Sequence, residues 1–92
     1  MKIIWSANAK RNFRRVIDYL YEEWSEKEVL NFQEKVRSLI EKISDNNALC
    51  PPSKFSNLRK CLIGKNNSLI FWFAPQSIYI ATLIGNRSSH PF

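Results

Sequence analysis

The stretch NFRRVIDYLYEEWSEKEVLNF, residues 12–32, decides the fold, because it contains the end of one amphipathic helix and the start of another. Apolar residues on each side of Ser25 recur at the three- and four-residue spacing of a single helix face. The two stripes are Phe13, Val16, Ile17, Leu20 and Trp24, then Val29, Phe32, Val36, Leu39, Ile40 and Ile43. Ser25-Glu26-Lys27-Glu28 is a capping box that begins a new helix. Helices joined this tightly must fold back as a hairpin or make a sharp corner.

The flanking sequence predicts strands. Residues 2–5 form a short β-type run, after which Ser6 is placed to cap a helix from about Ala7 to Trp24. Over residues 44–57, Pro and Asn interrupt both the helical and the strand spacing of apolar residues, so we interpret this segment as a loop. Three further β-type runs follow at roughly 58–63, 68–73 and 78–84, separated by turns of hairpin length.

These elements give the order β-α-α-β-β-β in 92 residues. That length is typical of one domain, so residues 1–92 are expected to form a single unit. Apolar helix stripes need a second layer to cover them. We therefore predict an α+β, two-layer fold in which the N-terminal helical hairpin packs on one face of a mostly antiparallel sheet.

Composition limits the classes of function. Fourteen Lys and Arg against eight Asp and Glu give a net charge of +6, which favours phosphate-rich or acidic partners. His90 is the only histidine, and Cys50 and Cys61 form no metal-binding motif or disulfide framework. We expect no metal, no cofactor and reduced thiols. No segment resembles a signal peptide or a membrane span, which predicts a cytoplasmic protein without a membrane partner.

The sheet is expected to have a second apolar face. Residues 69–73 are apolar on both faces, where a half-covered sheet would alternate, and residues 78–84 repeat this pattern. One interpretation is that the sheet curls around the helices and its aromatic edges are half buried. The other is that a partner chain covers this face, since large exposed apolar patches mark interfaces. Trp72 and Tyr79, with Lys65 nearby, are then the candidate binding residues.

Basic residues near these strands form a candidate catalytic cluster. Arg59 and Lys60 are adjacent in one run, so they point to opposite faces. Arg87 and His90 follow the last run. If the last run pairs near the first of the three, Arg59 or Lys60 joins Arg87 and His90 at one end of the open face. Each also has a simpler explanation, because strand lysines guard edges against aggregation and Arg87 can hold the tail in place.

The first predicted helix carries further cations, namely Lys10, Arg11, Arg14 and Arg15. In an antiparallel hairpin they are expected beside Glu34, Glu41 and Asp45 of the second helix, as exposed ion pairs. The alternative is a phosphate-binding stripe.

Three pieces of the chain resemble the RelE/ParE toxin superfamily. IWSANA, residues 4–9, resembles the family's strand that runs into a helix through small residues. Residues 12–32 resemble its helical hairpin. LRKCLIGKNNSLIFWFAPQSIYIATLIGNRSSHPF, residues 58–92, resembles its L-R strand, its meander and its Arg-x-x-x-Pro ending. The resemblance implies a bacterial type II toxin that a cognate antitoxin neutralises in a hetero-oligomer, with Lys65, Trp72 and Tyr79 binding the antitoxin or the target.

The resemblance implies two possible targets. RelE-like members cleave mRNA on the ribosome, whereas ParE-like members bind DNA gyrase. For RNA cleavage, Arg59 or Lys60 and Arg87 would stabilise developing charge, and His90 would act as acid or base. RelE-like enzymes use basic residues with a late Tyr or His, but no tyrosine follows His90 here. Gyrase binding requires a binding surface but no proton transfer, so this sequence meets the requirements of gyrase binding more easily than those of RNA cleavage.

Two other functions fit the same residues. One is a non-toxic basic nucleic-acid-binding module whose sheet aromatics stack bases; the candidates are Phe71, Trp72, Phe73 and Tyr79. The order of elements is unusual for such a sheet, and adjacent aromatics must lie on opposite faces. The other is a degenerate toxin that persists only in complex with an antitoxin.

Overall fold

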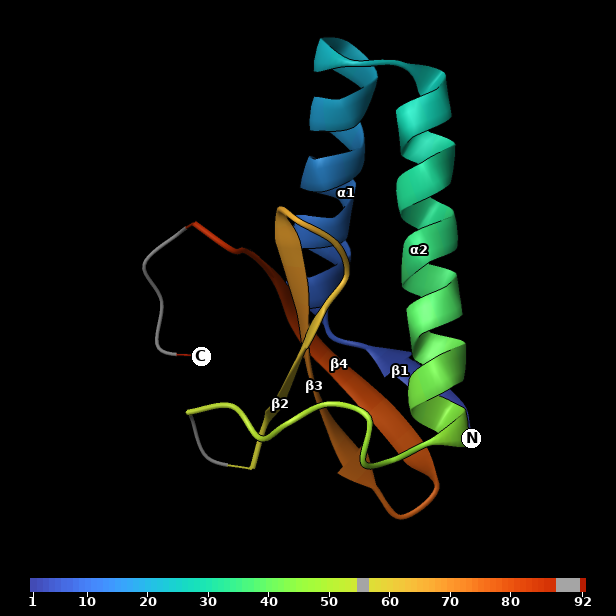
Figure 1. Cartoon of the computed structure of the whole chain (residues 1–92), viewed down its shortest axis with the longest axis vertical. Helices are drawn as coiled ribbons and strands as arrows, with labels where there is room; N and C mark the ends of the chain where they lie inside the picture. Colours follow the sequence, from blue (N-terminus) through green and yellow to red (C-terminus); the bar gives the residue numbers. More distant parts are fainter. Residues whose placement is uncertain (55–56, 88–91) are drawn as a thin grey trace.

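The computed structural model describes residues 1–54, 57–87 and 92, and its elements follow the predicted order (Figure 1). They are β1 (Lys2–Trp5), α1 (Ala7–Glu23), α2 (Glu26–Asp45), β2 (Arg59–Leu62), β3 (Asn67–Ala74) and β4 (Ser77–Gly85). The helices pack against one face of the sheet, so the predicted two-layer α+β fold is confirmed.

The sheet has the strand order β1-β4-β3-β2. β2 pairs with β3 and β3 with β4, both antiparallel, whereas β1 lies parallel to β4. The mostly antiparallel sheet is therefore confirmed. A register shift between Ile70 and Phe71 leaves Ala81 of β4 without a partner in the ladder.

Serine caps set the start of both helices. Ser6 Oγ accepts a hydrogen bond from Ala9 N (2.9 Å) and donates one to the carbonyl oxygen of Ala81 (2.6 Å). The first helix is thus capped and fastened to β4 by the same hydroxyl. Ser25 Oγ accepts from Glu28 N (3.4 Å), as the capping box predicts, and α2 turns back along α1 as a hairpin.

The core lies between the hairpin and the sheet. Its buried members include Phe32, Val36 and Ile43 of α2 and Leu69, Phe71, Ile78, Ile80 and Leu83 of the strands. The hairpin is longer than the sheet, and its turn extends past the strands (Figure 1). Trp24, expected on the buried stripe, is consequently 67% exposed. Among the described residues, no helix has both the length and the apolar character needed to cross a bilayer.

The expectation of two free thiols is wrong, because Cys50 and Cys61 form a disulfide bond. The loop after α2 turns back along β2: Ser53 N donates to Leu58 O (2.8 Å) and Lys60 N to Pro51 O (3.3 Å). That path brings Cys50, which is 2% exposed, next to Cys61. The composition of the loop did not predict this path, since Pro and Asn define an irregular segment but not its course.

Removing the disulfide is expected to destabilise the protein. The cross-linked cysteines are 11 residues apart, and closing a loop of this size contributes roughly 2–3 kcal/mol by restricting the unfolded chain. Reduction should therefore lower Tm by on the order of 10 °C. Thermal unfolding followed by circular dichroism, with and without reductant, measures the change. The double variant Cys50→Ser, Cys61→Ser should be insensitive to reductant, and a wild-type Tm equally insensitive would contradict the bond.

Candidate functional site

The strand register places Arg59 and Lys60 on opposite faces of the sheet, as predicted. Arg59 pairs with Phe71, which is fully buried in the core beneath the helices. Lys60 pairs with Ile70, and alternation along the strand directs both of these side chains to the other face. The two adjacent cations therefore cannot act on the same group.

Arg59 is held by contacts within its own chain. Its Nη1 donates a hydrogen bond of 2.9 Å to the carbonyl oxygen of Cys50. Its Cζ lies 5.7 Å from the centre of the Phe73 ring, close enough for a cation–π attraction. These contacts fasten the loop after α2 to the sheet, so the position of Arg59 is explained by structure alone.

Lys60 lines an open groove along the outer edge of β2. The groove, of about 640 Å³, lies between α2, the loop that follows it and β2. Its apolar lining consists of Leu39, Leu49, Pro51, Pro52, Leu62 and Phe92. Leu62 is 65% exposed, so part of this apolar surface is not covered by the described chain.

Lys65 and Arg87 lie together at the end of the sheet formed by the β2–β3 turn. Asn86 N donates to the carbonyl oxygen of Asn66 (2.8 Å), and Asn86 Nδ2 donates to that of Lys65 (3.0 Å). Arg87 therefore directly follows a residue that is fastened to the turn carrying Lys65. The arrangement results from β3–β4 pairing, which brings Gly85 opposite Asn67.

The predicted cluster of Arg59 or Lys60 with Arg87 is wrong in its geometry. It required β4 to lie near β2, but β3 separates these two strands. Arg59 and Lys60 pair with Phe71 and Ile70 in the middle of β3, whereas Arg87 follows the end of β4. His90, the fourth member, falls outside the described residues. Over the described ranges, no three His, Cys, Asp or Glu side chains are grouped to hold a metal ion.

The second face of the sheet is partly covered by the chain itself. Trp72 and Tyr79 stack at 4.6 Å between ring centres and are half buried. Ile70 is fully buried, as is Ser68, whose hydroxyl donates to Asn86 Oδ1. Half-buried aromatics thus describe this face better than a wholly open apolar surface. Large exposed apolar side chains lie instead mainly on the hairpin and beside the groove: Tyr19, Tyr21, Trp24, Leu30, Leu49 and Leu62.

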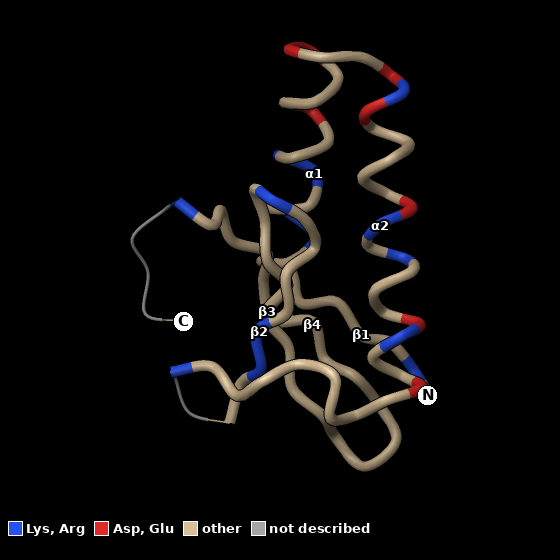
Figure 2. Tube along the Cα trace, viewed as in Figure 1, with Lys and Arg blue, Asp and Glu red and all other residues tan. Residues whose placement is uncertain are grey.

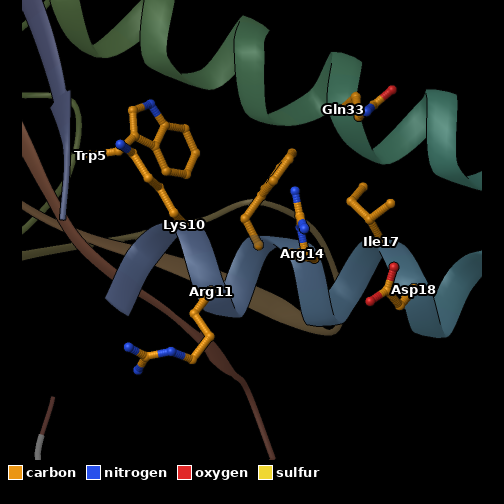
Figure 3. Close-up of a pocket in the computed structure, with 8 residues that line it drawn as sticks. Trp5, Lys10, Arg11, Arg14, Ile17, Asp18 and Gln33 are labelled. Atoms are coloured by element: carbon orange, nitrogen blue, oxygen red, sulfur yellow. The ribbon is translucent and has the colours of Figure 1, made fainter. Parts of the chain in front are cut away.

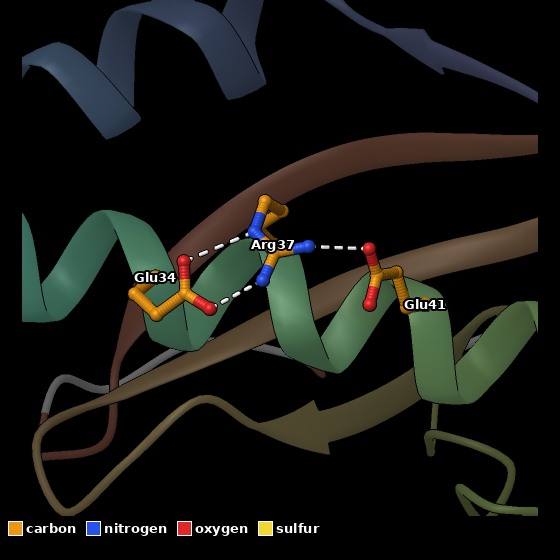
Figure 4. A network of polar contacts seen from close by, with 3 residues as sticks. All are labelled: Glu34, Arg37 and Glu41. Atoms are coloured by element: carbon orange, nitrogen blue, oxygen red, sulfur yellow. Dashed lines mark hydrogen bonds and ion pairs between the residues drawn. The ribbon is translucent and has the colours of Figure 1, made fainter.

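The expected ion pairs between α1 and α2 are absent from the described residues. Arg37 Nε donates to Glu34 Oε2 (3.0 Å), and Arg37 also pairs with Glu41 (Figure 4). The hydrogen bond from Arg37 holds the pKa of the Glu34 carboxyl below its usual value. Partners three and four residues apart on one helix are closer than partners on a neighbouring helix. Within the part of the chain that the structure describes, the cations of α1 therefore have no acidic partner within 4 Å.

A second open groove, of about 820 Å³, lies between β1, α1 and α2. Its lining combines the apolar side chains of Trp5, Phe13 and Ile17 with Lys10 and Arg14. Figure 3 shows Lys10 and Arg14 on the side of α1 that faces α2, with Arg11 directed away. The sequence does indicate this groove, because cations alternate with the apolar stripe of α1. Those cations were expected to form ion pairs with α2, so the groove was not predicted.

Comparison with known proteins gives a consistent assignment. The family model for the ParE toxin of type II toxin–antitoxin systems, parDE, matches residues 3–88. A solved structure of a chromosomal ParDE toxin–antitoxin system from P. aeruginosa is similar at TM-score 0.75 and 12% identity, covering 92% of this chain and 95% of that one. No curated protein sequence matches the chain.

Two further solved structures share the fold. A YoeB/ParE toxin from Agrobacterium tumefaciens is similar at TM-score 0.68 and 12% identity, covering 94% of this chain and 99% of that one. A chain of a heterotetrameric YoeB–YefM toxin–antitoxin complex from Staphylococcus aureus is similar at TM-score 0.62 and 18% identity, covering 89% and 92% respectively. At these identities the likeness concerns the fold.

Replacing Arg59 with alanine is expected to destabilise the protein, because the Cys50 carbonyl oxygen loses its charged donor. Loss of a half-buried bond of this type costs about 1–2 kcal/mol. Lys60→Ala is the matched control, a neighbouring cation that lines the open groove, and should change the free energy of unfolding by less than about 0.5 kcal/mol. Urea unfolding measures both. Equal losses would contradict the structural role of Arg59.

Proposed function

The chain belongs to the ParE toxin family of type II toxin–antitoxin systems, and we propose that it arrests growth by binding DNA gyrase, without cutting RNA. The observation that carries this proposal is the separation of the cations. Arg59 and Lys60 lie on opposite faces of β2, level with the middle of β3, whereas Arg87 follows the end of β4, and β3 separates β2 from β4.

The chemistry of RNA cleavage explains why that separation matters. A base must activate the 2′-hydroxyl, a cation must stabilise the phosphorane, and an acid must protonate the leaving oxygen, all within hydrogen-bond reach of one phosphate. Arg59 already donates to a backbone carbonyl, and Glu34 and Glu41 are paired with Arg37. Gyrase binding requires only a complementary surface, which these residues can supply without convergence.

A cognate antitoxin is the second partner that we propose. The solved relatives include toxin–antitoxin complexes, YoeB–YefM from Staphylococcus aureus and DinJ–YafQ from E. coli. The net charge of +6 suits an acidic segment. We assign Lys65 and the Trp72–Tyr79 pair to binding of this antitoxin or of the target, in a cytoplasmic hetero-oligomer.

The nucleic-acid module based on stacked sheet aromatics is not favoured. Phe71 and Phe73 face the helices in the core, where their rings meet edge to face at 5.6 Å. Trp72 and Tyr79 stack on each other. No adjacent pair of open aromatic faces is left on the sheet for bases.

Expression of the chain alone is expected to stop growth, and co-expression of its antitoxin to restore it. During arrest, gyrase-linked DNA breaks should accumulate, because a bound inhibitor traps the enzyme on DNA. Transcripts should show no codon-phased cuts. Trapped gyrase is measured on isolated DNA, and cuts are measured by mapping transcript ends on ribosomes.

The variants Arg87→Ala and His90→Ala separate binding from chemistry. A general acid or base contributes about 100- to 10,000-fold to a rate, whereas loss of one surface contact should change the dose for arrest by less than about tenfold. Codon-phased cuts that the wild type makes and Arg87→Ala does not would contradict gyrase binding as the mode of action.

A further inference from the structure

A groove between the end of the hairpin and the β2–β3 turn brings one cation and two exposed aromatic side chains together. It lies between α1, the start of α2 and the β2–β3 turn, and its lining includes Arg15, Tyr19, Trp24, Asn66 and Asn67. Tyr19 is 58% exposed and Trp24 67% exposed. Arg15 and Tyr19 are four residues apart on α1, so they share one helix face.

Three more cations surround the same turn. Lys35 of α2 and Lys65 line a small pocket that shares Asn66 and Asn67 with this groove. A Cβ built on Gly64 would lie 3.7 Å from Lys35 Nζ, so the ammonium group lies against the turn. Arg87 follows Asn86, whose side chain donates to the carbonyl oxygens of Gly64 and Lys65. We call Arg15, Lys35, Lys65 and Arg87 the turn cations.

The turn cations are not neutralised within the described chain. None of them forms a salt bridge there, because all such bridges among these residues involve Arg37. One carboxylate, that of Glu28, lines both this groove and the pocket that contains Lys35 and Lys65. Figure 2 shows blue segments on α1, on the β2–β3 turn and after β4, while the acidic segments of this region gather at the turn between α1 and α2. The positive surface therefore runs from Tyr19 toward the β2–β3 turn.

We propose that this groove binds single-stranded nucleic acid, with the turn cations along the phosphodiester backbone and Tyr19 stacking a base. Proteins that bind single strands combine a positive groove with exposed aromatic rings in this way. The amides of Asn66 and Asn67 add hydrogen-bond partners for phosphate or base. Tyr19 and the turn cations would also suit an acidic protein partner, because Tyr and Arg are enriched at protein interfaces, and that alternative is one outcome of the tests below. The proposal does not depend on gyrase being the target.

Titration of the purified full-length chain with oligo(dT) or oligo(U) of about 12 nucleotides should quench part of its tryptophan fluorescence, because Trp24, one of three tryptophans, borders the groove. Binding should weaken with salt, with a slope of log affinity against log salt of about −3 if all four cations contact phosphate. The two oligonucleotides distinguish DNA from RNA as the natural source of the strand.

Matched variants locate the site. Lys65→Gln should reduce the slope of log affinity against log salt by about 0.7. Lys10 is an exposed cation that lines the other groove, so Lys10→Gln should reduce this slope by less than Lys65→Gln does. Tyr19→Ala should weaken binding by about tenfold or more. Tyr21→Ala, 67% exposed on the same helix but absent from this lining, is its control.

Several results would overturn the proposal. One is no saturable binding at low salt. Another is equal effects of Lys65→Gln and Lys10→Gln, which would mean diffuse attraction to a basic protein. Turn-cation variants that weaken binding of an acidic antitoxin but leave oligonucleotide affinity unchanged would reassign the surface to a protein partner.

Discussion

The parallel pairing of β1 with β4 is the constraint on which the rest of the molecule depends. Ile3 lies opposite Ile78 and Trp5 opposite Ile80, so the first residues of the chain are aligned with the last strand. Ser6 then caps α1 while its hydroxyl donates to Ala81. This serine fixes where the first helix leaves the sheet, and the tight capping-box turn returns α2 over the same face. Both helices therefore cover one face, and functional surfaces must lie on the edges, on the hairpin or on the second face.

That arrangement separates groups that the chain order would allow to meet. β3 lies between β2 and β4, which keeps Arg59 and Lys60 apart from Arg87. It also brings Arg87 next to the β2–β3 turn and hence near Lys65, through the hydrogen bonds of Asn86. The basic character of the protein is thus distributed over several surfaces. Such a distribution suits contact with large partners better than attack on one bond.

Local signals predicted the local structure well. The capping box at Ser25 and the apolar stripes define both helices to within about two residues, because caps and periodicity act over a few positions. The largest difference is at the end of α2, which continues to Asp45 into the segment predicted as a loop from residue 44. Features that depend on contacts between distant parts of the chain could not be predicted from local sequence patterns. The pairing of β4 with β1, the path that joins Cys50 to Cys61, and the overhang that exposes Trp24 all follow from tertiary packing. The prediction of ion pairs between the two helices failed because it overlooked a local interaction: Glu34 and Glu41 pair with Arg37 on the same helix.

The central claim, that these cations contribute separately to a binding surface, is tested most directly by a double-mutant cycle. The affinity of the purified chain for DNA gyrase would be measured for wild type, Lys60→Ala, Arg87→Ala and the double variant. Distant residues without shared partners should give additive losses, with a coupling energy within about 0.5 kcal/mol of zero. Residues of one catalytic unit are grossly non-additive. A double variant no worse than either single variant, or a wild-type chain that does not bind gyrase, would contradict the account.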